Sequence, residues 1–189
     1  MRKPTGYDDA QTYSDGFQKL PPGGYVVEVK NAVLGKYNDG GEYLQISFDI
    51  IEGEYKDFYT NQYRQSTFEP KEYKGRIRLS LPKEDGTEKD GWTLRSLKTN
   101  LTAIEESNNG YAWDWNEKTL IGKTAGLLFR NKEYNYNGNH GFWTEPFRFI
   151  AADKVRSGDF TQPKDKLLNE KAPANPALTF QPLEEDPPF

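Results

Sequence analysis

Cysteine is absent from this chain of 189 residues, which contains a single histidine. Without cysteine the chain forms no disulfides, has no thiol nucleophile and cannot bind zinc through thiolates. One histidine is too few for a cluster of imidazole ligands. We therefore expect a protein that depends on no metal and no cofactor.

Long hydrophobic runs are also missing. No stretch approaches the roughly 20 apolar residues that a membrane-spanning helix needs. Residues 1–7, MRKPTGY, carry positive charges with no apolar stretch behind them, unlike a secretory signal. The sequence therefore predicts a cytoplasmic protein with no membrane association.

Positive charge is in slight deficit, with 25 basic against 29 acidic residues and a net charge of −4. Three of the acids are residues 184–186, and without them the balance is 25 − 26 = −1. A nucleic-acid-binding domain usually has a basic surface, so the overall charge argues against that class unless basic residues cluster locally. Aromatic side chains, in contrast, make up 14% of the chain. They bury large areas per residue and predict a compact, aromatic-rich domain.

Composition divides the chain into three parts. Residues 1–20 are polar and rich in turn formers, and we expect a flexible N-terminal arm. Residues 21–160 contain the periodic patterns of a folded domain. From residue 161 onward prolines punctuate a segment of little periodicity, so residues 161–189 are predicted to be a disordered tail.

Five segments of the central part have the pattern of β-strands. In the second, apolar residues from Leu44 to Ile50 alternate with polar ones, which indicates one buried and one exposed face. The predicted strands are residues 25–34, 42–51, 76–81, 123–130 and 142–153, and residues 131–141 are predicted to be a long hairpin loop.

One helix is predicted, over residues 93–106, between the third and fourth strands. The order β-β-β-α-β-β matches a five-stranded OB-type barrel, which binds its ligands on strands 2 and 3 and on the loops between strands 1–2 and 4–5. A β-sandwich with one helix is the alternative. The apolar stripe of the helix consists of Leu94, Leu97, Leu101 and Ile104, and Asp90 or Thr93 is expected to cap its start.

Basic and aromatic residues are interleaved in two segments of the predicted domain. Binding a single strand without sequence preference requires cations along the phosphates and aromatic faces under the bases. Residues 60–80 contain five basic and two acidic residues, so positive charge is concentrated locally. The candidate nucleic-acid-binding residues are Lys36 and Tyr37 of the first loop; Tyr59, Tyr63, Arg64, Lys74, Arg76 and Arg78; and Lys132, Tyr134, Tyr136 and Trp143 around the last loop.

Catalytic residues are not apparent. Asp49, Asp57 and Asp114 have no spacing that brings two of them onto one face, and no nucleophile is paired with a base. We therefore predict that the protein is not an enzyme. Trp113, Trp115 and His140 are interpreted as structural residues.

The last seven residues, LEEDPPF, combine three carboxylates with two prolines and a phenylalanine. A partner can receive them with an apolar pocket for the ring, a cation for the α-carboxylate and a basic ridge for the acids. This tip resembles the C-terminal tip of bacterial single-stranded DNA-binding proteins, although Pro187 replaces an aliphatic residue and the acids are fewer. The resemblance implies docking of replication, repair and recombination enzymes, with Phe189 as the anchor. The partner-binding residues are then Glu184, Glu185, Asp186, Pro187, Pro188 and Phe189.

The body of the chain carries four short motifs: IEESN at 104–108, WDW at 113–115, LIGK at 120–123 and DKVRSGDF at 153–160. In these motifs it is similar to proteins from replication gene clusters of phages that infect Gram-positive bacteria. The resemblance implies a phage-encoded single-stranded DNA-binding protein with an OB-type core.

Together these patterns predict a non-enzymatic protein that binds single-stranded DNA in phage replication and recombination, within an infected bacterium. It recruits host enzymes through its tip, and a homo-oligomer is compatible with the sequence. Two alternatives stay open. One is a carbohydrate-binding β-domain, because aromatic rings stack on sugars as well as on bases. The other is an adaptor that uses the tip and binds no DNA.

Overall fold

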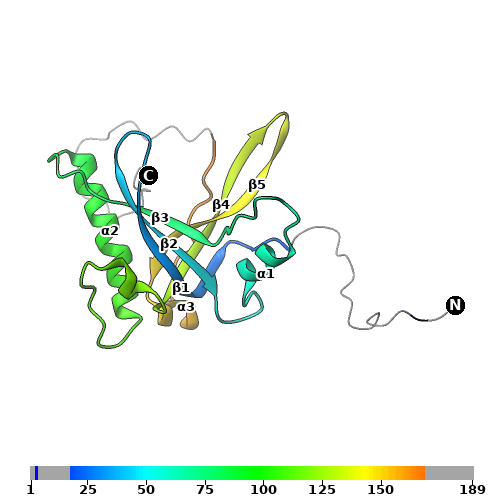
Figure 1. Cartoon of the computed structure of the whole chain (residues 1–189), viewed down its shortest axis with the longest axis horizontal. Coiled ribbons are helices and arrows are strands. Elements are labelled where there is room, and N and C mark those ends of the chain that lie inside the picture. Colours follow the sequence, from blue (N-terminus) through cyan, green and yellow to red (C-terminus); the bar gives the residue numbers. More distant parts are fainter. Residues whose placement is uncertain (1–2, 4–17, 169–189) are drawn as a thin grey trace.

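The computed structural model describes residue 3 and residues 18–168. Within them, five strands form one antiparallel sheet in the order β3-β2-β1-β4-β5 (Figure 1). The edge strands β3 and β5 also contact one another. The strands are β1 (Gly23–Lys36), β2 (Glu42–Ile50), β3 (Arg76–Ser80), β4 (Thr124–Tyr136) and β5 (Asn139–Ile150). The helices are α1 (Phe58–Gln65), α2 (Glu88–Glu106), α3 (Ala152–Ser157) and a 3-10 helix, η1 (Glu117–Leu120). The prediction of a mainly β fold with five strands is confirmed.

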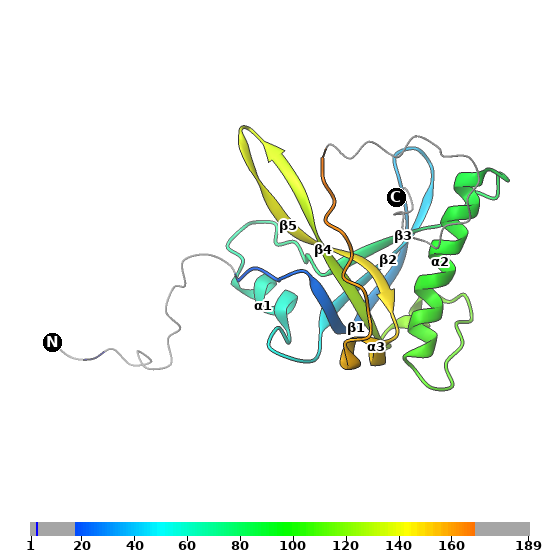
Figure 2. The same cartoon turned by 180° about the vertical axis from the view of Figure 1, so that it is seen from behind.

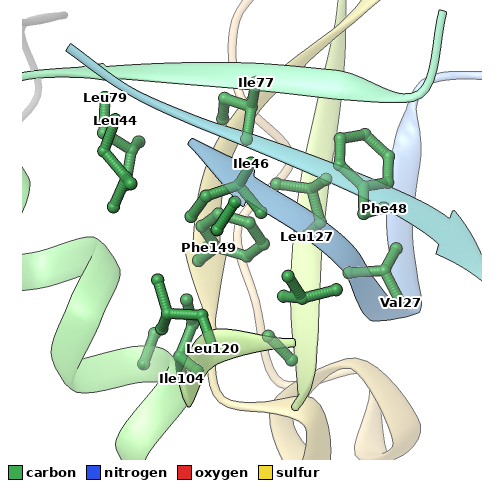
Figure 3. Close-up of a cluster of buried hydrophobic side chains, with 14 of the residues drawn as sticks. Val27, Leu44, Ile46, Phe48, Ile77, Leu79, Ile104, Leu120, Leu127 and Phe149 are labelled. Carbon is green, nitrogen blue, oxygen red and sulfur yellow. The ribbon is translucent and has the colours of Figure 1, made fainter. Parts of the chain in front are cut away.

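The core lies on the inner face of the sheet. Leu44, Ile46 and Phe48 of β2 are fully buried, as the alternation in this strand predicts. Ile77 and Leu79 of β3 point the same way, because β2 and β3 pair in register at these positions (Figure 3). Side chains from β1, β4 and β5 complete the cluster: Val27, Val29, Ala125, Leu127, Phe129 and Phe149.

Helix α2 packs against β3, β4 and β5. Leu97, Leu101 and Ile104 enter the core as predicted, but Leu94 does not, because more than half of its side chain is exposed. The helix starts earlier than predicted, at Glu88, and its cap is Thr87 rather than Asp90 or Thr93. The Thr87 hydroxyl accepts the backbone N–H of Asp90 at 3.2 Å, which is the usual geometry of a threonine N-cap.

The strands of the β4–β5 hairpin are longer than the sequence predicts. Residues 131–141, predicted to be a loop, continue both strands to a two-residue turn at Asn137 and Gly138. Both turn residues have positive φ, 50° and 79°, and Asn-Gly is the pair that tolerates this conformation best. β5 ends at Ile150, so residues 152–157 form α3 rather than the end of a strand.

Helix α1, which the sequence analysis does not predict, is held by a buried carboxylate of the neighbouring strand. Its own N-cap, Asp57, makes no side-chain capping bond. Instead Asp49 of β2 accepts the backbone N–H groups of Tyr59 (3.0 Å) and Thr60 (2.9 Å). These groups have no partner within the first turn of a helix. Asp49 therefore replaces the missing local cap, and its carboxylate is fully buried.

Residues 161–168, which the sequence analysis assigns to the disordered tail, run beside β4 (Figure 2). The Lys166 N–H donates to the Asn131 carbonyl, and the Glu133 N–H donates to the Lys166 carbonyl, both at 2.8 Å. The pairing occurs because β1 leaves β4 after Phe129 and exposes that edge. The rest of the predicted tail, from residue 169, lies outside the described residues, as does most of the predicted N-terminal arm. Among the residues described, no helix combines the length and apolarity needed to cross a membrane.

The cap formed by Asp49 can be tested with two isosteric substitutions. Asp49→Asn replaces an accepting oxygen by a donor that faces a backbone N–H, so we expect the free energy of unfolding to fall by about 2 kcal/mol. Asp57→Asn removes the same charge at the same helix end without breaking a capping bond, and asparagine tolerates the positive φ of 58° at this position. It should change stability by less than about 0.5 kcal/mol. Urea unfolding followed by circular dichroism measures both, and equal losses would contradict this assignment.

Candidate nucleic-acid interface

The outer face of β2 and β3 is polar and aromatic. In the register of this pair, Gln45 is opposite Arg78 and Ser47 is opposite Arg76. These side chains alternate with the buried residues, so they point away from the core. The alternation predicts this placement of both arginines.

Tyr43 occupies the centre of this face. Its ring lies directly over Gly35 of β1, where a Cβ atom would come within 2.5 Å of the ring. The Arg78 guanidinium is 4.7 Å from the ring centroid, and the Tyr37 ring is 4.6 Å away at an angle of 52°. The Tyr37 hydroxyl is 3.1 Å from the Ser80 hydroxyl, which fixes the first loop to β3. We call Tyr37, Tyr43 and Arg78 the β2–β3 platform.

The cations around the platform differ in their partners. Lys36 pairs with Glu42 at 3.3 Å, and Arg76 pairs with Glu72. Arg78 instead donates to the neutral side chain of Gln45 at 3.0 Å. A cation that already neutralises a carboxylate gains less from a phosphate than one that does not. Of these three cations, Arg78 is therefore best placed to meet a phosphate.

A second aromatic surface covers one face of the β4–β5 hairpin. Tyr134 and Trp143 stack at 5.6 Å with an angle of 14° between their rings. Lys132 lies 5.3 Å from the centre of the Trp143 ring. Tyr136 is two residues beyond Tyr134 in β4, so its side chain lies on the same face of the hairpin. It is 72% exposed. All four predicted residues of this hairpin thus share one face, which we call the hairpin face.

Charge on the hairpin face is balanced by one carboxylate. Glu145 pairs with Arg130 at 3.0 Å and with Lys132 at 3.4 Å. Arg130 is buried, so its charge is not available at the surface. The hairpin face therefore offers ring faces more than positive charge.

His140 lies on the opposite side of the hairpin, where it hydrogen-bonds Glu133. Glu133 also accepts the backbone N–H of Leu168 at 2.9 Å. The His140 bond, followed by the Leu168 bond, lowers the pKa of the Glu133 carboxyl below its usual value. His140 thus lies in β5 rather than in the turn before it, and its bond to Glu133 ties the hairpin to residues 161–168.

The predicted residues around α1 form a third, separate surface. Tyr63 is 40% exposed, and Lys71 lies 6.0 Å from the centre of its ring. Arg64 and Lys74 are exposed as well. Tyr59 was predicted wrongly, because it is only 7% exposed and packs edge-on against Phe48, so no base can reach its ring. The apolar contacts of α1 with the sheet take this ring into the core.

Tyr43 of the platform and Gln45, the hydrogen-bond partner of Arg78, are missing from the sequence-based candidates. The alternation of the second predicted strand could have identified both residues, because it places them on the polar face. Only the structure shows that Tyr43 meets Arg78, because that contact depends on the register of β2 and β3.

The carboxylates weighed as a catalytic or metal site have separate structural roles. Asp49 caps α1, and Asp114 accepts bonds from Asn116 and Thr119 in the loop before η1. In residues 18–168 no three metal-ligating side chains come together. The predicted partner-binding residues, 184–189, lie outside the described part of the chain.

Comparison with known proteins identifies no matching family and no matching curated protein.

The position of the Tyr43 ring over Gly35 predicts the effect of adding a methyl group. In Gly35→Ala the new Cβ displaces the ring and separates it from Arg78. The Nε proton resonance of Arg78, shifted by the ring in the wild type, should then move in an NMR spectrum. The matched control is Gly23→Ala at the other end of β1, where the Cβ meets its nearest side-chain atom at an ordinary 3.8 Å. An unchanged Arg78 resonance in Gly35→Ala would show that the ring does not lie against this guanidinium.

Proposed function

We propose that this protein binds single-stranded DNA without strong sequence preference and is not an enzyme. The observation that carries the proposal is the β2–β3 platform, in which the Arg78 guanidinium lies 4.7 Å from the centroid of the Tyr43 ring. Unpaired bases need a flat ring to stack on, and their phosphates need a cation within reach. The platform offers both on the neighbouring strands β2 and β3.

The hairpin face extends the proposed surface. Its stacked pair, Tyr134 and Trp143, offers further π surface, with Lys132 beside it. Base stacking on aromatic rings contributes about 1 to 3 kcal/mol per base and does not depend on base identity. A protein built on such contacts binds any sequence. Its affinity then comes more from stacking than from charge, because Lys36, Arg76 and Lys132 are already paired.

The arrangement of the strands supports an OB-type barrel. The order β3-β2-β1-β4-β5, the contact between β3 and β5, and a helix between β3 and β4 all fit that architecture. OB-type domains bind oligonucleotides on the face of strands 2 and 3 and with the loops between strands 1–2 and 4–5. Those are the places of the platform, of Tyr37 and of the β4–β5 hairpin. This agreement concerns only the arrangement of the strands. It supports the proposal, which rests on the platform.

In the cell we propose a role in phage DNA replication and recombination, in the cytoplasm of an infected bacterium. The similarity of four motifs and of the C-terminal tip supports this role. The tip, residues 184–189, is proposed to recruit host replication, repair or recombination enzymes. Its terminal Phe189 is the proposed anchor.

One observation favours an alternative function, the binding of a neutral carbohydrate. Because Arg130 is buried and both Arg130 and Lys132 are paired with Glu145, the stacked rings of the hairpin face would suit a carbohydrate as well as a base. The two ligands differ in their response to salt. Binding to a single strand weakens as salt rises, by about 0.7 log units per log unit of salt for each neutralised phosphate. Binding to a sugar does not.

The outer face of β2 and β3 predicts that Arg78 and Arg76 contribute unequally to binding. Arg78→Ala should weaken binding to a fluorescent oligo-dT by about tenfold and reduce the salt slope by about 0.7. Arg76→Ala should have a smaller effect, since Glu72 already pairs with that guanidinium. Lys118→Ala, an exposed cation away from the platform, is the control and should bind like the wild type. Titrations at two salt concentrations measure all three. Salt-independent binding by the wild type would favour the carbohydrate alternative.

The tip predicts a separation of two activities. Removing residues 184–189 should leave the affinity for oligo-dT unchanged or raise it, because the deletion removes three carboxylates. It should abolish capture of host replication or repair enzymes by the immobilised protein. Phe189→Ala is the matched control and should abolish capture while keeping all three carboxylates. A clear loss of oligo-dT affinity on deletion would contradict the proposed division.

A further inference from the structure

Trp115 is 73% exposed although it lies in a well-defined loop. The loop (residues 107–116, the Trp115 loop) connects α2 to η1. Its other tryptophan, Trp113, packs against the core, and its ring centroid is 4.8 Å from that of Trp115 with the two rings tilted by 40°. The proposed strand-binding surface does not use either ring.

Hydrogen bonds fix the Trp115 loop from both sides. The Trp113 N–H donates to the Glu105 carboxylate at 2.8 Å, and its indole N–H donates to the Asn116 carbonyl at 3.0 Å. Asp114 accepts the Thr119 hydroxyl at 2.9 Å. The loop therefore presents Trp115 at a fixed position, which lowers the entropy cost of a contact made through that ring.

The backbone of Trp115 is strained as well. Its φ is 65°, a left-handed conformation that costs a bulky residue roughly 1 to 2 kcal/mol. The bonds of the neighbouring residues hold it there. Because the ring is exposed, it contributes little to the core. The energy spent on this backbone conformation therefore points to a contact between the ring and another molecule.

The charge around Trp115 indicates which kind of molecule can bind there. Residues 105–117 contain four acidic residues and no lysine or arginine. The exposed Lys118, and Lys123 at 4.3 Å from the centre of the Tyr111 ring, offset only part of that charge. DNA is repelled by such a surface, whereas a basic protein surface is attracted to it.

This chain carries a basic surface with an exposed ring of its own. Residues 66–75, between α1 and β3 (the Phe68 segment), include Phe68, which is 71% exposed. With α1 they supply Arg64, Lys71 and Lys74, whose side chains are all exposed. The same stretch contains two acids, Glu69 and Glu72, and Glu72 is paired with Arg76, so positive charge is in excess. Phe68 borders a shallow hollow together with Gln62, Ser66, Glu72 and Lys74.

The two surfaces lie on opposite sides of the molecule. In Figures 1 and 2 the loop after α2 is on one side of the sheet, and α1 with the segment that follows it is on the other. A single copy cannot bring them together, but two copies in the same orientation can. Such a contact joins different patches of the two copies, and copies related by translation without rotation then form an open row.

We propose that the Trp115 loop of one copy docks on the Phe68 segment of a second copy, so that the protein associates head to tail. The acidic rim of the loop meets Arg64, Lys71 and Lys74, and the Trp115 ring packs against Phe68. The contact is small, and its dissociation constant is expected on the order of 0.1 mM. On one long strand, neighbouring copies have an effective concentration of about 1 mM. The contact then gives about tenfold cooperativity, a consequence that rests on the proposed strand binding.

Sedimentation velocity of the protein without DNA tests the contact itself. Between about 0.01 and 0.3 mM, which spans the expected dissociation constant, the mean mass of the wild type should rise. Trp115→Ser and Phe68→Ser should each remain monomeric. A mixture of the two should form dimers and nothing larger, since each variant keeps the surface that the other has lost. Leu94→Ser, a substitution at an exposed leucine outside both surfaces, is the control and should associate like the wild type.

Association of both variants at wild-type levels, or a mixture that stays monomeric, would overturn the proposal. Circular dichroism melts of the variants verify that each is folded. A second titration separates this inference from the proposed function. Trp115→Ser should bind an oligo-dT that holds one copy as tightly as the wild type does, and should lose about tenfold in cooperativity on long poly-dT. If the wild type binds neither DNA, the proposed function fails, while the sedimentation result still decides the head-to-tail contact.

Discussion

The alternation of side chains along β2 and β3 is the constraint on which the rest of the structure depends. Leu44, Ile46 and Phe48 must face the core, and the two-residue period then places Tyr43 and Gln45 outside. The antiparallel register sets Arg78 opposite Gln45, within reach of the Tyr43 ring. A shift of one residue would turn every one of these side chains to the other face. The packing of the core and the geometry of the platform are therefore fixed by the same pairing.

Local charge matters more in this protein than its net charge of −4. Several surface cations are already paired with carboxylates, among them Lys36, Arg76 and Lys132. Arg78 bonds an amide instead. Around Trp115 the balance is reversed, with acids alone over residues 105–117. One acidic chain thus presents a surface suited to a polyanion and another that repels it, and the two are built from different elements of the fold.

Much of the fold could be predicted from local patterns, and the errors have identifiable physical causes. The strands and α2 follow from their periods. The length of the β4–β5 hairpin was missed because the Asn137-Gly138 turn lies in a polar stretch, where the strand signal is weak. Helix α1 was missed because Asp49, distant in sequence, supplies its cap. The arginines of β3 were found from alternation, whereas the contact of Tyr43 with Arg78 depends on pairing between strands, which a single sequence does not reveal.

The central claim is that a base stacks on the ring of Tyr43, and paired substitutions at this position test it most directly. Tyr43→Phe keeps the ring and loses only the hydroxyl, whereas Tyr43→Leu keeps an apolar side chain without a π face. The measurement is the equilibrium affinity of each variant for oligo-dT at one salt concentration. The account predicts that Tyr43→Phe binds within about twofold of the wild type and that Tyr43→Leu binds at least about tenfold more weakly. Equal affinities for the two variants would contradict it.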